Sequence, residues 1–286
     1  MPRTWIVVPC YNEAERLDAA AFETELDRRP DLAFLFVNDG SGDGTADILD
    51  GIARRHHRAA AIHLERNGGK AEAVRQGMRL VCTRPEAEFV GFWDADLATP
   101  LGEIEAFERT LERRSDVEAV FGARLPLKGR RIRRRRIRQL LGGVFSFAAS
   151  LCLGGRFVDT QCGAKLFRAS GELYHVLERP FLARWIFDVE IVARWRQLRT
   201  FLGQSPIEER LFEQPLDEWH EVAGSKLKSG DFGKAALELT KIWRRHVGPG
   251  SDRAAGDWLR SYSPRTLIAE RELVEAREQP PLRRAA

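Results

Sequence analysis

Short apolar runs alternate with amphipathic segments over the first 125 residues, and this alternation restricts the possible folds more than any other feature of the sequence. Strand, helix, strand repeated at this spacing predicts an α/β fold: a mostly parallel sheet with helices on both faces. The predicted strands are residues 4–9, 32–39, 60–64, 89–96 and 118–124. The predicted helices between them are residues 14–28, 44–56, 69–83 and 101–114.

A polar cluster follows each of the first four predicted strands. The clusters read PCYNEAE, NDGSGDGT, RNGGKAEA and DADLATP. In parallel sheets of this kind, ligands bind at the carboxyl ends of the strands. We therefore expect a binding site where these four clusters meet.

The segment GFWDADLATP (91–100) places two carboxylates, Asp94 and Asp96, directly after an apolar run. Residues two apart on a strand point the same way, so the two like charges are predicted to lie close together. Hard carboxylate oxygens suit Mg²⁺ or Mn²⁺, which bridges to substrate phosphates and would cancel the repulsion. Taken alone, the pair also fits two solvated turn aspartates.

Length and composition fit one large domain or one domain with a small appendage. The chain has 286 residues, is 43% hydrophobic and carries a net charge of +4. We expect a main domain over 1–247, with a first half over 1–125 and a second half over 126–247. Residues 248–286 are predicted to form a peripheral helix and a loose tail.

Seven arginines crowd between residues 130 and 138 and precede an uncharged run, residues 139–155. Such a basic block favours a phosphate-rich partner: nucleic acid, an anionic membrane or a phosphorylated substrate. The uncharged run has 17 residues and four glycines, which predicts a buried or interfacial helix rather than a membrane span. Further on, helices are expected at 184–195 and 231–246, and a strand at 206–212.

Two familiar phosphate-binding motifs do not match. In GSGDGT (40–45), the last glycine of a dinucleotide fingerprint is Thr45. In GGKA (68–71), a P-loop would need glycine in place of Leu64 and a hydroxyl residue after Lys70.

Seven segments in order resemble a known family. VVPCYNEAERL, VNDGSGDGT, NGGKAEAVRQGM and DADLATP are similar to the nucleotide-sugar domain of family 2 inverting glycosyltransferases, which have the GT-A fold. DTQCGAKLF, RWIFDVE and WHEVAGSKL are similar to the branch that transfers a sugar to a polyprenyl phosphate, closest to dolichyl-phosphate glucosyltransferases. The resemblance spans residues 4–245 and implies that 1–125 is the nucleotide-sugar-binding half and 126–247 the acceptor half of the main domain.

For the donor, the resemblance implies ten binding positions. They are Pro9, Tyr11, Glu13, Asp39, Lys70, Asp94, Ala95, Asp96, Ser225 and Lys226. Tyr11 would pack on the base or ribose, and Asp39 would accept a hydrogen bond from the base edge. Asp94 and Asp96 would hold Mg²⁺ or Mn²⁺ on the diphosphate, and a loop with Ser225 would act as a lid.

For catalysis, the resemblance and the chemistry together indicate five residues. They are Asp96, Arg124, Arg138, Asp159 and Asp188. The two arginines would bind phosphate bidentately. A polyprenyl phosphate is mostly dianionic at pH 7 and attacks the anomeric carbon directly, with inversion, whereas a sugar hydroxyl would need a general base. Candidate bases are Asp159, Asp188 and Glu190, although Asp188 fits a structural pair with Arg184 equally well.

Departures from the family pattern favour a glucosyl over a mannosyl enzyme. Mannosyl relatives carry other residues at Ala98, Gly142 and His220, so UDP-glucose is the expected donor. The glucosyl relatives usually have an N-terminal membrane anchor, whereas this sequence starts at its first strand. We therefore expect a cytoplasmic protein whose attachment to the inner face of an anionic membrane uses residues 130–155.

Three other functions stay open at this stage. One is a transferase of the same fold that acts on a soluble acceptor. Another is a sugar nucleotidyltransferase, although these normally have a basic, glycine-rich loop where PCYNEAE stands. The third is a non-catalytic binder, and no nucleic acid is expected because such a protein has no use for Asp94 and Asp96.

Overall fold

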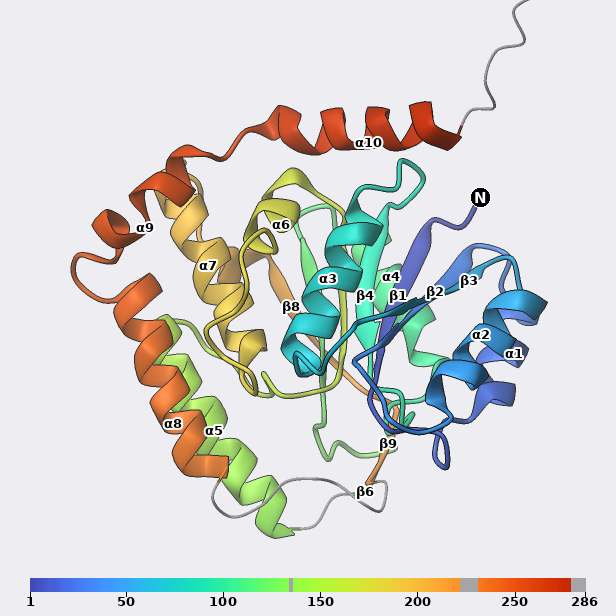
Figure 1. The fold of residues 1–286 in the computed structure, drawn as a ribbon. Helices are drawn as coiled ribbons and strands as arrows, with labels where there is room; N and C mark the ends of the chain where they lie inside the picture. The colour runs from blue at the N-terminus through green and yellow to red at the C-terminus, as the bar shows by residue number, and fades with distance from the viewer. Residues whose placement is uncertain (134–135, 222–230, 279–286) are drawn as a thin grey trace, which may run out of the picture.

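The computed structural model describes residues 1–133, 136–221 and 231–278 (Figure 1). Its main sheet has seven strands: β1 (Thr4–Cys10), β2 (Leu32–Asn38), β3 (Ala59–His63), β4 (Phe89–Trp93), β5 (Ala119–Ala123), β7 (Ala164–Arg168) and β8 (Leu211–Pro215). Their spatial order is β3-β2-β1-β4-β7-β5-β8. β7 is antiparallel to both of its neighbours and the other pairs are parallel, which confirms the predicted mostly parallel sheet.

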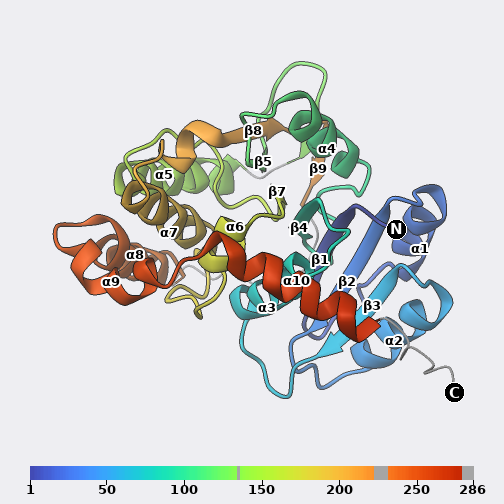
Figure 2. The same cartoon turned by 90° about the horizontal axis from the view of Figure 1, so that it is seen from above.

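Helices cover both faces of this sheet (Figure 2). The first four are α1 (Ala19–Arg28), α2 (Thr45–Arg55), α3 (Lys70–Cys82) and α4 (Glu103–Arg113). The later ones are α5 (Arg136–Leu153), α6 (Gly171–Val176), α7 (Phe187–Phe201), η1 (Ile207–Arg210), α8 (Asp231–Ile242), η2 (Trp243–Val247), α9 (Ser251–Arg260) and α10 (Pro264–Glu278). A second, two-stranded sheet pairs β6 (Arg131–Arg133) with β9 (Glu218–His220) in parallel.

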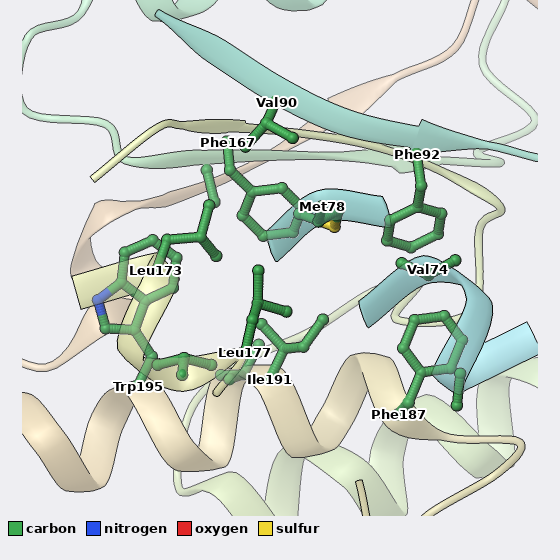
Figure 3. Close-up of a cluster of buried hydrophobic side chains, with 14 of the residues drawn as sticks. Val74, Met78, Val90, Phe92, Phe167, Leu173, Leu177, Phe187, Ile191 and Trp195 are labelled. Carbon is green, nitrogen blue, oxygen red and sulfur yellow. The ribbon is translucent and has the colours of Figure 1, made fainter. Parts of the chain in front are cut away.

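The sheet is buried on both faces because its strands are apolar at successive positions. In β1, Trp5 and Val7 join a core with α3, α6 and α7, whereas Ile6 and Val8 join a core with α1, α2 and α4. Figure 3 shows the first core, in which side chains of α3 and α7 meet those of β4 and β7. This two-sided burial explains why the strands lack the polar-apolar alternation of a half-exposed sheet.

Several predicted helices and strands begin or end at the wrong residue. The fourth strand ends at Trp93, not at residue 96, so the aspartates lie in the turn that follows. The predicted strand at 206–212 is the turn η1 followed by β8, because pairing with β5 begins only at Leu211. α1 begins at Ala19, where the Asp18 side chain caps it by accepting from the amide of Ala21 at 3.0 Å.

The sequence pattern does not indicate β7, an interior strand of the sheet beside the central strand β4. It has only five residues and lies between β4 and β5, two strands that belong to the parallel part of the sheet. β4 approaches it so closely that a Cβ at Gly91 would overlap the backbone carbonyl of Lys165. Glycine at this position therefore permits the pairing that brings residues 159–163 to the edge where β4 ends.

The predicted helix in residues 139–155 is confirmed as α5. Within the described residues, no helix is both long and apolar enough to cross a membrane. The expected C-terminal helix is also present, and it is a pair, α9 and α10. Trp258 of α9 stacks on His175 with 4.7 Å between ring centroids, and α10 lies across the edge where β1 and β4 begin (Figure 1). The predicted tail from residue 279 lies outside the described residues.

We predict that Gly77→Ala lowers the free energy of unfolding by about 1–3 kcal/mol, because α3 packs directly on the sheet. A Cβ there would lie 2.5 Å from Cγ1 of Val7 and 2.9 Å from Cγ2 of Val37. Denaturant titration measures the change. In Gly143→Ala, the matched control in α5, the added Cβ meets open space, and we expect a gain of up to about 1 kcal/mol. Equal effects in both variants would contradict this close packing.

Candidate active site

A cleft of about 850 Å³ opens at the edge of the sheet where β1, β2 and β4 end. Ten of the predicted site residues line it: Pro9, Tyr11, Glu13, Asp39, Lys70, Asp94, Ala95, Asp96, Arg124 and Asp188. They come from positions far apart in the sequence, so the expectation that the strand-end clusters meet is confirmed. Asp159 lies beside the lining through its contact with Arg124. Ser225, Lys226 and the side chain of Arg138 lie outside the described part of the chain.

A turn, not a strand, brings the two aspartates together. Leu97 takes a left-handed conformation with φ of 52°, and Asp96 accepts a hydrogen bond from the amide of Ala98 at 3.1 Å. The amide of Asp94 donates to the carbonyl of Gly163 at 3.0 Å. A Cβ at Gly163 would overlap the Asp94 carboxylate, so glycine leaves room for this side chain. Burial, together with the nearby charge of Asp94, raises the pKa of Asp96 above its usual range.

Lys70 is the first residue of α3 and forms an ion pair with Asp94. Burial alone would lower the pKa of Lys70, but the negative charges of Asp94 and Asp188 raise it, so the ammonium group stays protonated. Asp39 fixes the preceding loop by accepting from the amides of Gly68 at 2.7 Å and Gly69 at 2.8 Å. Gly69 has a φ of 90°, which glycine adopts without strain. An ammonium group and a helix N-terminus therefore face the cleft together.

The β1 side of the cleft is built on a folded loop that follows this strand. Glu13 is buried and forms an ion pair with Arg16 at 2.6 Å. Its backbone amide donates to the hydroxyl of Thr45 at 2.9 Å, which ties the loop to the start of α2. Tyr11 lies on the rim with 39% of its surface exposed. Tyr11 therefore borders the cleft at a position that solvent reaches.

On the acceptor side, Arg124 forms a bidentate pair with Asp159, with nitrogen–oxygen distances of 2.6 and 2.7 Å. The amide of Asp159 donates to Glu213 at 2.7 Å, and the Arg124 guanidinium lies over the Trp219 ring at 5.3 Å. Burial would lower the pKa of Arg124, but Asp159 raises it, so the guanidinium stays charged. Asp159 thus orients an arginine that lines the cleft.

The partner of Asp188 is Lys165, and the structural pair with Arg184 that the sequence suggested is wrong. The Lys165 ammonium is completely buried, lies 2.8 Å from the Asp188 carboxylate and donates to the Cys162 carbonyl at 2.6 Å. Sequence spacing does not predict this pair, because Lys165 lies on β7 and Asp188 lies on α7, two separate elements. Glu190, the third candidate base, is fully buried and pairs with Arg194 at 2.6 Å, away from the cleft.

Sequence reasoning missed the segment that closes the cleft on the α7 side. Arg184 lines the cleft and donates to the Gly68 carbonyl at 3.4 Å, reaching across to the loop that Asp39 holds. Glu238 of α8 positions this segment by accepting from the amides of Arg184, Trp185 and Ile186 at 3.1–3.3 Å. The motif RWIFDVE includes this segment, but its pattern predicts a helix from residue 184, and the helix begins only at Phe187.

The cleft is lined by more carboxylates than cations. In the described part of the chain, seven Asp or Glu residues line it against five Lys or Arg residues. Arg16, Lys70 and Arg124 form ion pairs with Glu13, Asp94 and Asp159. An additional cation would reduce the repulsion between this lining and a ligand that carries several negative charges.

This fold and site define a class of protein, and comparison with known sequences names it. Residues 5–171 match the profile of glycosyl transferase family 2. The chain therefore belongs to this family and is a glycosyltransferase.

Two of the relatives carry names that refer to dolichyl phosphate and undecaprenyl phosphate. The chain is 31% identical over 253 residues to dolichyl-phosphate beta-glucosyltransferase ALG5C of Trichomonas vaginalis, covering 84% of this chain and 70% of the relative. It is 26% identical over 239 residues to undecaprenyl-phosphate mannosyltransferase of Micrococcus luteus, covering 84% of this chain and 93% of that protein.

Solved structures confirm the GT-A fold. Glucosyl-3-phosphoglycerate synthase of Mycobacterium tuberculosis, in complex with Mn²⁺, UDP and glucosyl-3-phosphoglycerate, superimposes with a TM-score of 0.61. The match is 15% identical and covers 87% of this chain and 81% of that one. The same enzyme with Mn²⁺, UDP-glucose and phosphoglyceric acid gives a TM-score of 0.58 at 15% identity, covering 84% and 78% of the two chains.

We predict that Asp188→Ala lowers the free energy of unfolding by about 3–5 kcal/mol, because it leaves the Lys165 ammonium buried without a counter-charge. Thermal or denaturant unfolding measures the loss. The double variant Lys165→Met, Asp188→Leu should recover most of it, since it removes both charges. The control Asp257→Ala breaks an exposed pair with Arg260 and should change stability by less than about 1 kcal/mol. Similar losses in both single variants would refute the structural role of the buried pair.

Proposed function

We propose that the protein transfers glucose from UDP-glucose to a polyprenyl phosphate, with inversion at the anomeric carbon and with Mg²⁺ or Mn²⁺ bound at Asp94 and Asp96. The observation that carries the proposal is the turn that presents these two carboxylates at the edge of the cleft. More carboxylate side chains than Lys and Arg side chains line this cleft in the described part of the chain. The names of the dolichyl-phosphate relatives support the acceptor, and the neighbouring fold that binds Mn²⁺ and UDP-glucose supports the donor.

The residues present fit a divalent cation. Mg²⁺ is commonly held by one or two carboxylates together with substrate phosphates, and Asp94 and Asp96 supply that number. The raised pKa of Asp96 shows that the second carboxylate lacks sufficient compensation in the protein alone. When bound, the cation supplies a Lewis acid for the departing diphosphate.

The donor would lie across the β1 and β2 strand ends. Tyr11 stacks on the base or ribose, and Asp39 accepts from the base edge with the lone pairs that Gly68 and Gly69 leave available. Lys70 and the first amides of α3 approach the diphosphate and stabilise the negative charge that develops as UDP leaves.

The acceptor would approach from the side of Arg124. A phosphate monoester has its second pKa near ~6 and is already nucleophilic at pH 7, so no general base is required. This agrees with the pairing of both candidate bases in the cleft, Asp159 with Arg124 and Asp188 with Lys165. We assign Arg124 to phosphate binding and keep the same role for Arg138. Asp159 then positions Arg124, and Asp188 holds Lys165.

Transfer activity tests the proposal directly. Purified protein with UDP-glucose and Mg²⁺ should release UDP only when a short polyprenyl phosphate is added, and chelation of the metal should stop the release. Asp96→Asn should lower kcat/KM at least about 100-fold, because a metal ligand contributes several kcal/mol to stabilising the transition state.

Asp116→Asn, at an exposed pair with Arg114 on the far side of α4, is the control and should leave the rate unchanged. UDP release that needs only a soluble sugar acceptor would instead favour the hydroxyl-acceptor enzyme. Full activity of Asp96→Asn would refute the metal role.

A further inference from the structure

α5 is apolar on two opposite faces, although only one of them is covered by the protein. Ser146, Ala149 and Leu153 are spaced three and four residues apart and are buried against the core. Val144, Phe147 and Leu151 have the same spacing on the opposite face, and they are 62%, 66% and 69% exposed. A helix at a protein surface normally carries polar residues on its outer face. α5 has no charged residue after Arg138.

α8 lies beside α5 and adds positive charge to the same region (Figure 1). The two helices touch where the thiol of Cys152 donates to the carbonyl of Leu239 at 3.9 Å. Along α8, the residues Lys234, Leu237 and Lys241 are spaced three and four apart and all are exposed. Leu237 is 66% exposed. The exposed stripe of α5 and the exposed lysines and leucine of α8 thus belong to two helices that touch.

We propose that these two stripes form a docking surface for an anionic lipid bilayer. Val144, Phe147, Leu151 and Leu237 would enter the boundary between headgroups and acyl chains, and the lysines of α8 would contact anionic headgroups. A second copy of the chain fits less well, because a two-fold contact would bring the basic stripes of both copies together. The sequence predicted attachment through residues 130–155. Within that range, the exposed stripe of α5 would make the apolar contact, whereas Arg130 and Arg131 are already paired with Asp217 and Glu218.

The same two helices also line the cleft, on their inner sides, through Gly142 and Phe145 of α5 and Ala235 of α8. Docking through the outer faces would therefore hold the cleft close to the bilayer, where it can receive the phosphate of a lipid whose chain stays in the membrane. This direction of approach rests on the proposed function, whereas membrane docking itself can be tested without any substrate.

The test is flotation of the protein with vesicles of phosphatidylcholine and phosphatidylglycerol in equal amounts. We expect the wild type to float with these vesicles, and the triple variant Val144→Ser, Phe147→Ser, Leu151→Ser to have a partition coefficient at least about tenfold lower. The control variant, Leu80→Ser, Phe201→Ser, Ile268→Ser, removes three exposed apolar side chains elsewhere and should float like the wild type. Unfolding curves of both variants establish that they fold.

A second measurement separates docking from catalysis. The triple variant should keep its activity on a water-soluble, short-chain polyprenyl phosphate and lose it on a long-chain acceptor embedded in vesicles. If the wild type acts on neither acceptor, the proposed function fails and flotation still decides the docking surface. The docking surface is refuted if the triple variant floats like the wild type, or if the wild type does not float. A wild-type dimer that becomes a monomer in the triple variant would also refute it, since the stripe would then be an interface between copies.

Discussion

The ion pair between Lys70 and Asp94 links the two halves of the cleft, and the geometry of the site depends on it. Lys70 begins α3, and Asp94 begins the turn after β4, so their contact fixes the helix N-terminus relative to the aspartate pair. Asp39 holds the loop before Lys70, and Gly163 leaves space for Asp94. Burial and the charge of Asp94 raise the pKa of Asp96, and the charges of Lys70 and Arg16 offset this only in part. The proposed divalent cation would supply further positive charge at this point.

The acceptor half relies on different contacts. Here the carboxylates Asp159 and Asp188 are paired with an arginine and with a fully buried lysine, so their negative charges are compensated within the protein. Glu238 of α8 binds the backbone of the segment that carries Arg184. The helix that forms part of the proposed membrane surface therefore also holds one wall of the cleft. The proposed docking surface and this wall of the cleft are connected through α8.

Much of the donor half could be predicted because its signals are local. The first five strands are continuous apolar runs, and each polar cluster follows its strand directly, so the edge where Asp39, Lys70 and Asp94 meet follows from the sequence pattern. The features that could not be predicted depend on contacts between residues far apart in the sequence. β7 is buried in the sheet only because β4 and β5 lie on either side, and the Lys165–Asp188 pair joins this strand to α7. The exposure of Val144, Phe147 and Leu151 required knowing which face of α5 the core covers.

Binding of UDP with and without Mn²⁺ tests the central claim that this acidic cleft holds a nucleoside diphosphate through a divalent cation. Isothermal titration of the wild type with UDP should give at least about tenfold tighter binding in the presence of Mn²⁺, a coupling of about 1.4 kcal/mol. Asp96→Asn should bind UDP with the same affinity whether or not Mn²⁺ is present. Tight binding of UDP by the metal-free wild type, unchanged by Mn²⁺, would contradict the account.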